Sequence, residues 1–266
     1  MLVSLLFGGL ATVFLVFPLV GDAGRERLIA TWSRWLMRAC GARVVELPAP
    51  GASPLASMCG RHGAGEGRLL LSNHVSWLDI FAIDSLAPAS FAAKAEIASW
   101  PLAGTLVARA GTVFVERGRR HAVHGVIRQM VAKLDAGLRA AVFPEGTTSD
   151  GRRLLPFHGN LVQAALDAGV PVVPLGLRYV DPDGQPSHAA MFVGDTTFLA
   201  SLWRITGHPR LIVEIHALPA IATGEGARRQ DIARAARGAI AARLSLPLDD
   251  SLSDTLRRAS ARAQRN

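Results

Sequence analysis

The sequence predicts an α/β fold in which helices flank a layered mixed sheet, preceded by an N-terminal membrane-anchoring helix. Two patterns predict this class. Short apolar runs alternate with amphipathic segments from residue 68 to residue 248, as expected where strands alternate with helices. Residues 1–21 carry no charge, whereas charged side chains recur along the rest of the chain. The 266 residues suffice for one catalytic domain with an extension at each end.

Residues 1–45 are predicted to form a membrane anchor followed by an interfacial helix. Leu, Val and Phe dominate Met1–Gly21, which has about the ~20 residues needed to cross a bilayer core. No basic residue precedes the apolar run and no small-residue cleavage site follows it, which favours a retained anchor over a cleaved signal peptide. Pro18 leaves open whether the segment spans the membrane or dips into one leaflet.

Basic residues follow the apolar segment and none precedes it, which places the body of the protein in the cytoplasm by the positive-inside rule. These residues are Arg25, Arg27, Arg34, Arg38 and Arg43. The stretch Arg25–Arg38 also contains Trp32 and Trp35, a mixture typical of a helix lying at a membrane interface. An ordinary surface helix packed on the domain is the alternative.

The formal charge of +8 predicts an anionic partner: a phospholipid surface, a phosphorylated substrate or nucleic acid. We do not expect nucleic acid, because the chain has a single Tyr and several Phe residues lie in apolar strand patterns. A non-catalytic, basic membrane-surface module is a remote alternative. Cys40 and Cys59 are not spaced as in a C-x-x-C motif, and two cysteines are too few for a disulfide scaffold. We predict that both are reduced, non-catalytic thiols.

The catalytic domain is predicted to span residues 68–248, after a linker at 46–67 that is rich in Pro, Gly, Ala and Ser. A basic C-terminal tail follows at 249–266. Apolar runs bounded by turn residues predict strands over Leu69–Ser72, Phe91–Lys94, Thr112–Glu116, Ala140–Phe143, Val170–Leu177 and Leu211–His216. The segments between and after them predict helices over Trp77–Leu86, Trp100–Arg109, His121–Ala136, Leu161–Ala168 and Arg228–Leu244.

The stretch from Leu71 to Asp79 carries the candidate chemistry. A predicted strand ends just before His74, and a helix is predicted to begin near Ser76. His74 then lies in the connecting turn and Asp79 in the first turns of the helix, so the Asp79 carboxylate can reach the imidazole. Such a contact fixes the tautomer and raises the basicity of the other ring nitrogen. No Ser or Cys nucleophile is indicated, although Ser72 and Ser76 leave a covalent route open. A His–Asp pair of this kind suggests a general base that acts directly on a substrate hydroxyl. The spacing alone is a weak signal, however, and by itself it favours a strand-end histidine with a structural role.

Other site classes lack their sequence signatures. The chain contains no phosphate-loop, dinucleotide-binding, zincin or nucleophile-elbow motif. His121 and His124 have helical spacing but no third ligand, so no metal and no bound cofactor are expected.

Four ordered blocks resemble the glycerolipid acyltransferase family, in particular the bacterial 1-acyl-sn-glycerol-3-phosphate acyltransferases. The first block is Asn73–Asp79 and the second is Gly111–Arg117. The third is Phe143–Thr147 and the fourth is Val170–Pro174. The resemblance covers roughly Leu69–Leu177.

The resemblance implies transfer of a fatty acyl group from a coenzyme A or acyl carrier protein thioester to the free sn-2 hydroxyl of 1-acyl-glycerol-3-phosphate, giving phosphatidic acid. It implies a bacterial inner-membrane enzyme whose catalytic domain faces the cytoplasm. His74 and Asp79 would be catalytic, with backbone amides near the turn stabilising the oxyanion. The acceptor would be bound by Lys94, Arg117, Glu145, Gly146 and Thr147, the two cations holding its phosphate and Glu145 accepting from hydroxyls or positioning the cations.

Thr148 departs from the pattern of the phosphate-specific members, which usually carry Arg directly after Glu-Gly-Thr. Arg152 or Arg153 could compensate. Otherwise the acceptor is another lysolipid, and the Glu-Gly-Thr-Thr pattern resembles members that acylate lyso-ornithine lipid. A lipid hydrolase that uses the same His–Asp pair is a further alternative.

Overall fold

The computed structural model describes residues 2–59, 63, 65–99, 103–115, 120–208 and 210–251. The strands are β1 (Ala42–Glu46), β2 (Arg68–Ser72), β3 (Ser90–Lys94), β4 (Val113–Val115), β5 (Arg139–Val142), β6 (Val172–Val180) and β7 (Leu211–Ala217). The α-helices are α1 (Leu2–Ala11), α2 (Asp22–Ala39), α3 (Leu78–Leu86), α4 (Ala103–Arg109), α5 (Arg120–Asp135), α6 (Gln163–Asp167), α7 (Phe198–Thr206) and α8 (Arg229–Leu244). Shorter helical turns are η1 (Thr12–Val16), η2 (Phe17–Leu19), η3 (Leu55–Met58) and η4 (Ala95–Ser99).

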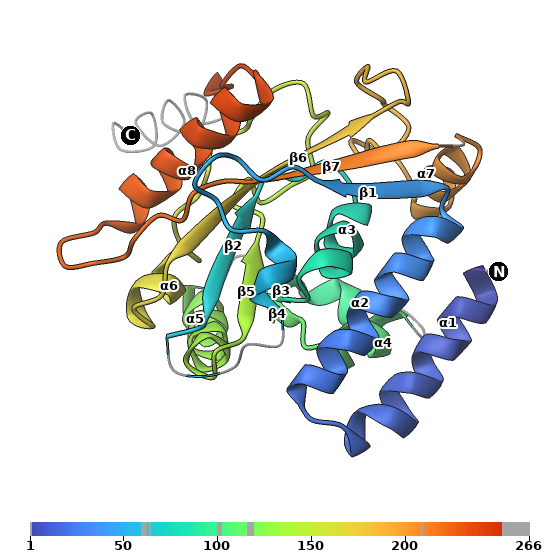
Figure 1. The fold of residues 1–266 in the computed structure, drawn as a ribbon, viewed down its shortest axis with the longest axis horizontal. Coiled ribbons are helices and arrows are strands. Elements are labelled where there is room, and N and C mark those ends of the chain that lie inside the picture. Colours follow the sequence, from blue (N-terminus) through green and yellow to red (C-terminus); the bar gives the residue numbers. More distant parts are fainter. Residues whose placement is uncertain are drawn as a thin grey trace, which may run out of the picture.

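The described strands form one seven-stranded mixed sheet in the order β1-β7-β6-β2-β5-β3-β4 (Figure 1). From β6 to β4 the neighbouring strands pair in parallel. Strand β7 pairs antiparallel with β6, and β1 runs parallel to β7. The carboxyl ends of the parallel strands therefore meet at one edge of the sheet, where α/β folds place their functional groups.

Strand β2 lies in the middle of the sheet and is buried on both faces, which explains its uninterrupted leucine run. Leu70 faces a core cluster shared with α2 and α3, while Leu69 and Leu71 face a second cluster shared with α5, α6 and α8. Figure 1 shows these two groups of helices on opposite sides of the sheet. The predicted mixed sheet flanked by helices is confirmed.

Each predicted strand and helix of the domain has a counterpart within a few residues of its predicted bounds. Part of the segment predicted as a helix from Trp100 lies outside the described residues, as does Glu116 at the end of a predicted strand. The sequence pattern did not predict β1 or α7. Strand β1 is short and half-exposed, and its partner β7 lies far along the chain, so a local pattern contains little information about it.

The N-terminal apolar segment is not one straight helix. Helix α1 passes into a π-helical stretch over Thr12–Val16, and Pro18 then stands in a 3-10 turn before α2 begins after Gly21. Proline removes a backbone donor and its ring crowds the preceding turn, which explains the break. None of the helices that the structure describes combines the length and apolar composition needed to cross a bilayer.

Helix α2 is tied to the catalytic sheet. It buries Leu36 and Met37 in the same core cluster as α3. Glu26 of α2 accepts a charge-assisted hydrogen bond from Arg139 of β5, and both side chains are buried. The Arg139 guanidinium also donates to the carbonyl of Met58, within the segment predicted as a linker. Residues 22–59 therefore pack against the sheet that carries the site.

Candidate active site

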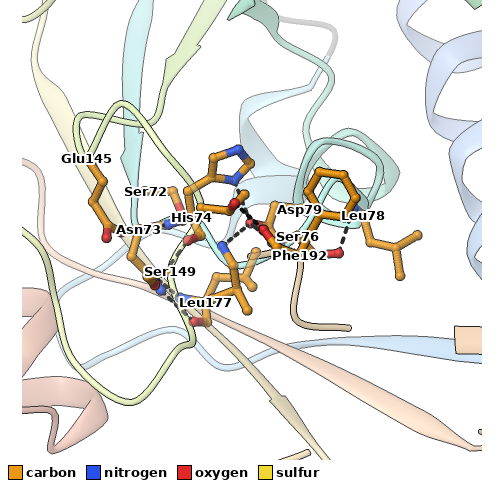
Figure 2. A network of polar contacts seen from close by, with 12 residues as sticks. Ser72, Asn73, His74, Ser76, Leu78, Asp79, Glu145, Ser149, Leu177 and Phe192 are labelled. Atoms are coloured by element: carbon orange, nitrogen blue, oxygen red, sulfur yellow. Dashed lines mark hydrogen bonds and ion pairs between the residues drawn. The ribbon is translucent and has the colours of Figure 1, made fainter. Parts of the chain in front are cut away.

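The candidate site lies in the connection between β2 and α3, at the carboxyl edge of the parallel strands (Figure 2). His74 is in this connection, and Asp79 is in the first turn of α3. The sequence prediction that the carboxylate folds back to the imidazole agrees with the structure. Asp79 Oδ2 lies 2.8 Å from His74 Nδ1.

Asp79 is fully buried and its hydrogen bonds fix the turn. Oδ2 also accepts from the backbone N–H groups of Val75 at 2.7 Å and Ser76 at 3.0 Å. Because the carboxylate is the acceptor, the proton of a neutral His74 lies on Nδ1. Nε2 is then left with a lone pair that can take a proton from a substrate hydroxyl.

The His74 ring is held between this carboxylate and an aromatic wall. It stacks on Phe143 with a centroid separation of 3.9 Å and an interplanar angle of 10°. Phe91 stacks in turn on Phe143 at 5.7 Å. The imidazole keeps 18% of its side-chain surface exposed, so it is packed yet accessible to a substrate.

Neighbouring segments clamp the backbone of the turn. Asn73 exchanges two hydrogen bonds of 2.8 Å with the backbone of Leu177 on β6. The carbonyl of His74 accepts from the backbone N–H of Ser149 at 2.7 Å, and that of Val75 accepts from Phe192 at 3.1 Å. Figure 2 shows these contacts converging on the turn from three separate stretches of chain.

Glu145 lies beneath the turn instead of facing open space. Its Oε1 accepts from the backbone N–H of His74 at 2.8 Å, and Oε2 accepts from that of Leu155 at 3.3 Å. Burial raises the pKa of this carboxyl to about 8, although the two N–H donors oppose the shift. The carboxyl group thus supports His74 through the main chain.

The amides of the turn also have partners. The N–H groups of His74, Val75 and Ser76 donate to Glu145 or Asp79. These three amides are therefore not available to a developing oxyanion, and oxyanion donors must come from elsewhere.

The other predicted binding residues come from three segments of the chain. Gly146, with φ +71°, and Thr147 are exposed directly after Glu145. A positive φ favours glycine, which explains its place in this turn. Lys94 ends β3, paired in register with Val115 of β4. Arg117 lies outside the described residues.

Tyr179 is a site residue that the sequence analysis did not identify. Its hydroxyl donates to Asp79 Oδ1 at 2.5 Å from strand β6. Burial and the Asp79 charge raise the pKa of this phenol well above its ordinary value, so it stays protonated as a donor. The only signal in the sequence was a polar-tipped aromatic that shares one strand face with Leu175 and Leu177.

The two arginines expected to compensate for Thr148 contact other side chains. The hydroxyl of Thr148 donates to the carbonyl of Phe192. Arg152 lies 2.9 Å from His188 Nε2, and Arg153 pairs with Asp249 at 3.2 Å. Within the part of the chain that the structure describes, no cluster of His, Cys, Asp and Glu side chains is suited to hold a metal ion.

Comparisons with known proteins show which proteins this chain is similar to. The acyltransferase family model matches residues 54–178. The chain is 40% identical over 217 residues to the lyso-ornithine lipid O-acyltransferase of Pseudomonas aeruginosa, covering 81% of this chain and 78% of that protein. It is 42% identical over 153 residues to the 1-acyl-sn-glycerol-3-phosphate acyltransferase of Neisseria gonorrhoeae, covering 56% and 58%.

The crystal structure of a 1-acyl-sn-glycerophosphate acyltransferase from Thermotoga maritima has a similar fold. The TM-score is 0.56 at 20% identity, with 87% of this chain and 85% of that chain covered. The family-model match and the extended similarity to the Pseudomonas protein show that the chain belongs to the glycerolipid acyltransferase family.

Proposed function

We propose that the protein transfers a fatty acyl group from a coenzyme A or acyl carrier protein thioester to the free hydroxyl of a lysolipid. The observation that carries this proposal is the 2.8 Å contact between His74 Nδ1 and Asp79, which leaves Nε2 to act as general base. Nε2 takes the hydroxyl proton as the oxygen attacks the thioester carbonyl. The C–S bond then breaks, and the imidazolium returns the proton to the departing thiolate. Such general-base catalysis contributes typically ~10²–10⁴-fold.

Lyso-ornithine lipid is the acceptor that we propose first. The relative from Pseudomonas aeruginosa, which is 40% identical over 217 residues, is named for this acceptor. Thr148 occupies the position where phosphate-specific members usually carry Arg, and Arg152 and Arg153 are directed at His188 and Asp249. Both arginines that follow Thr148 therefore already contact another side chain in the described part of the chain.

The second candidate acceptor is 1-acyl-glycerol-3-phosphate, with phosphatidic acid as product. Relatives from Neisseria are named for this acceptor. Lys94 and Arg117 match family positions that bind phosphate, and Arg binds it in a bidentate fork that Lys cannot provide.

The N-terminal segment is proposed to hold the enzyme on the inner membrane, with the catalytic domain facing the cytoplasm. Phe7, Leu15 and Leu19 are exposed at 58%, 68% and 83%, as expected of side chains that contact lipid. Phe14 receives the guanidinium of Arg109 at 4.2 Å from its ring centroid, so a cation adjoins this apolar surface. An anionic bilayer suits both features.

The test is an assay of purified protein in detergent with acyl-coenzyme A or acyl carrier protein as donor. Each acceptor is supplied separately, and both diacyl product and free fatty acid are measured. Diacyl product that disappears in His74→Ala, with an unchanged circular dichroism spectrum, is expected. Free fatty acid as the main product would identify a hydrolase, and full transferase activity in His74→Ala would refute the proposed mechanism.

A further inference from the structure

Helix α7 presents an apolar face to its surroundings. Its inner side is fully buried through Ser201 and Ile205. On the outer side Phe198, Leu199 and Trp203 are exposed at 39%, 75% and 82%. The side chain of Thr197 caps the helix by accepting from the N–H of Ala200. A capped helix with three large apolar residues outside is typical of a surface that contacts a partner.

An aromatic row connects this face with the N-terminal helices. Ring centroids are 4.9 Å apart between Phe198 and Trp77, 6.0 Å between Trp77 and Phe81, and 5.6 Å between Phe81 and Trp32. Trp32 then donates from its indole N–H to the carbonyl of Leu5 in α1. The apolar face of α7 is therefore continuous, through packed rings, with helix α1, which carries the exposed Phe7.

The charges around α7 identify the partner. Arg204, in the last turn, and Arg210, just after the helix, are both exposed. A cavity of about 670 Å³ beside Trp203 and Arg204 is also lined by His188, and by His208 paired with Asp181 at 2.8 Å. Large apolar side chains, an exposed Trp and adjacent cations together suit a lipid interface with anionic headgroups. A second copy of the chain would carry the same charge of +8 and be repelled.

We propose that α7 is a second membrane-docking helix, which seats the catalytic domain on an anionic phospholipid bilayer. Phe198, Leu199 and Trp203 enter the boundary between headgroups and acyl chains, and Arg204 and Arg210 remain among the headgroups. Docking also orients the catalytic turn, because the indole N–H of Trp77, two residues before Asp79, donates to Ser201 of α7 at 3.1 Å. Docking helps catalysis because a lysolipid acceptor resides in the bilayer. This part of the inference rests on the proposed function.

The test compares three full-length proteins for binding to vesicles of phosphatidylethanolamine with phosphatidylglycerol. They are the wild type, the double variant Leu199→Asn/Trp203→Asn, and Leu248→Asn. Leu248 is a matched control, because it is 50% exposed and adjoins Leu154 in the core cluster that contains α8, on the other side of the sheet. We expect vesicle binding of the double variant to fall about tenfold or more, since full burial of one such side chain already contributes about that factor. Leu248→Asn should bind as the wild type does.

Two further measurements complete the test. Lipids brominated in their acyl chains should quench the fluorescence of the wild type more than that of Trp203→Phe. In detergent micelles the double variant should keep wild-type transferase activity, while its activity on vesicle-embedded acceptor falls.

Equal vesicle binding, or equal quenching of Trp203→Phe, would overturn the docking proposal. So would a lipid-free dimer that the double variant dissociates, because a second copy would then cover the face. A wild type without transferase activity even in micelles would refute the proposed function, whereas the binding and quenching results would still decide the role of α7.

Discussion

Tyr179 donates its hydroxyl to Oδ1 of Asp79 at 2.5 Å, from a strand 100 residues further along the chain. The other oxygen of the same carboxylate binds the His74 imidazole and two backbone amides. Every partner of Asp79 is thus a donor, and burial excludes water from it. Such a carboxylate is held in one orientation, which in turn holds the His74 ring.

Replacing Tyr179 with Phe should lower kcat about three- to thirtyfold with little change in KM. The ring still fills its site, but Asp79 loses one donor and its charge is less stabilised. The carboxylate then favours imidazolium more strongly, so the acidic limb of the pH profile of kcat/KM should move to higher pH. Kinetics measured across the pH range test this. A profile that keeps its position would mean that Tyr179 contributes only to packing.

Asp79→Asn should lower kcat/KM about a hundredfold or more. An amide offers one acceptor atom and places an NH₂ group against donors that the carboxylate now satisfies, so both the tautomer and the turn are disturbed. The matched control is Asp84→Asn on the same helix. Burial raises the pKa of the Asp84 carboxyl to about 8, so an amide resembles its neutral form. Comparable losses in both variants would point to the helix and away from the His74 contact.

Glu145→Gln should make stability less dependent on pH. The pKa of Glu145 is about 8 in the folded protein and near 4.5 in the unfolded chain, so folding binds this proton more tightly. Its contribution is fully present below pH ~4.5 and is lost as the pH rises towards 8, at ~1.4 kcal/mol per pH unit as an upper bound.

Denaturant unfolding at pH 5 and pH 8 measures that dependence. The wild type should lose more stability than Glu145→Gln between the two values, and Asp84, which both proteins retain, cancels in the comparison. Parallel losses in the two proteins would show that Glu145 does not titrate in this range.

Thr148→Arg should shift acceptor preference towards 1-acyl-glycerol-3-phosphate, by roughly tenfold in the ratio of kcat/KM values, because a charged hydrogen bond to phosphate contributes ~1.5–3 kcal/mol. The control is Thr148→Val, which removes the hydroxyl bonded to the Phe192 carbonyl without adding a charge. Competition assays with both acceptors measure the ratio. An unchanged ratio in Thr148→Arg would show that this position does not face the headgroup.

Arg139→Met should destabilise the protein by about 3–5 kcal/mol, because it leaves the buried Glu26 carboxylate without its guanidinium partner. The double variant with Glu26→Gln should recover part of this loss. A double-mutant cycle from urea unfolding gives the coupling. Additive effects would mean that α2 is held to the sheet by its apolar contacts alone.

The sequence correctly predicted those helices and strands whose local hydrophobic pattern is strong. The leucine run of β2 and the helical periodicity of α5 and α8 are each buried as their patterns indicate. The spacing of His74 and Asp79 also predicted their contact, because a turn and one helical turn bring the two side chains together without distant residues. Strand β1 and Tyr179 were missed, since each depends on a partner far along the chain.

By itself the sequence determined the α/β class and the His74–Asp79 pair, which follow from local periodicity and short-range spacing. Four ordered blocks that resemble a known family indicated the family. Only the tertiary structure placed Glu145 beneath the catalytic turn, Tyr179 behind Asp79 and α7 beside Trp77. These contacts join residues tens to more than a hundred positions apart. They exist because parallel strand pairing brings separate strand ends to one edge of the sheet, and no local pattern encodes that alignment.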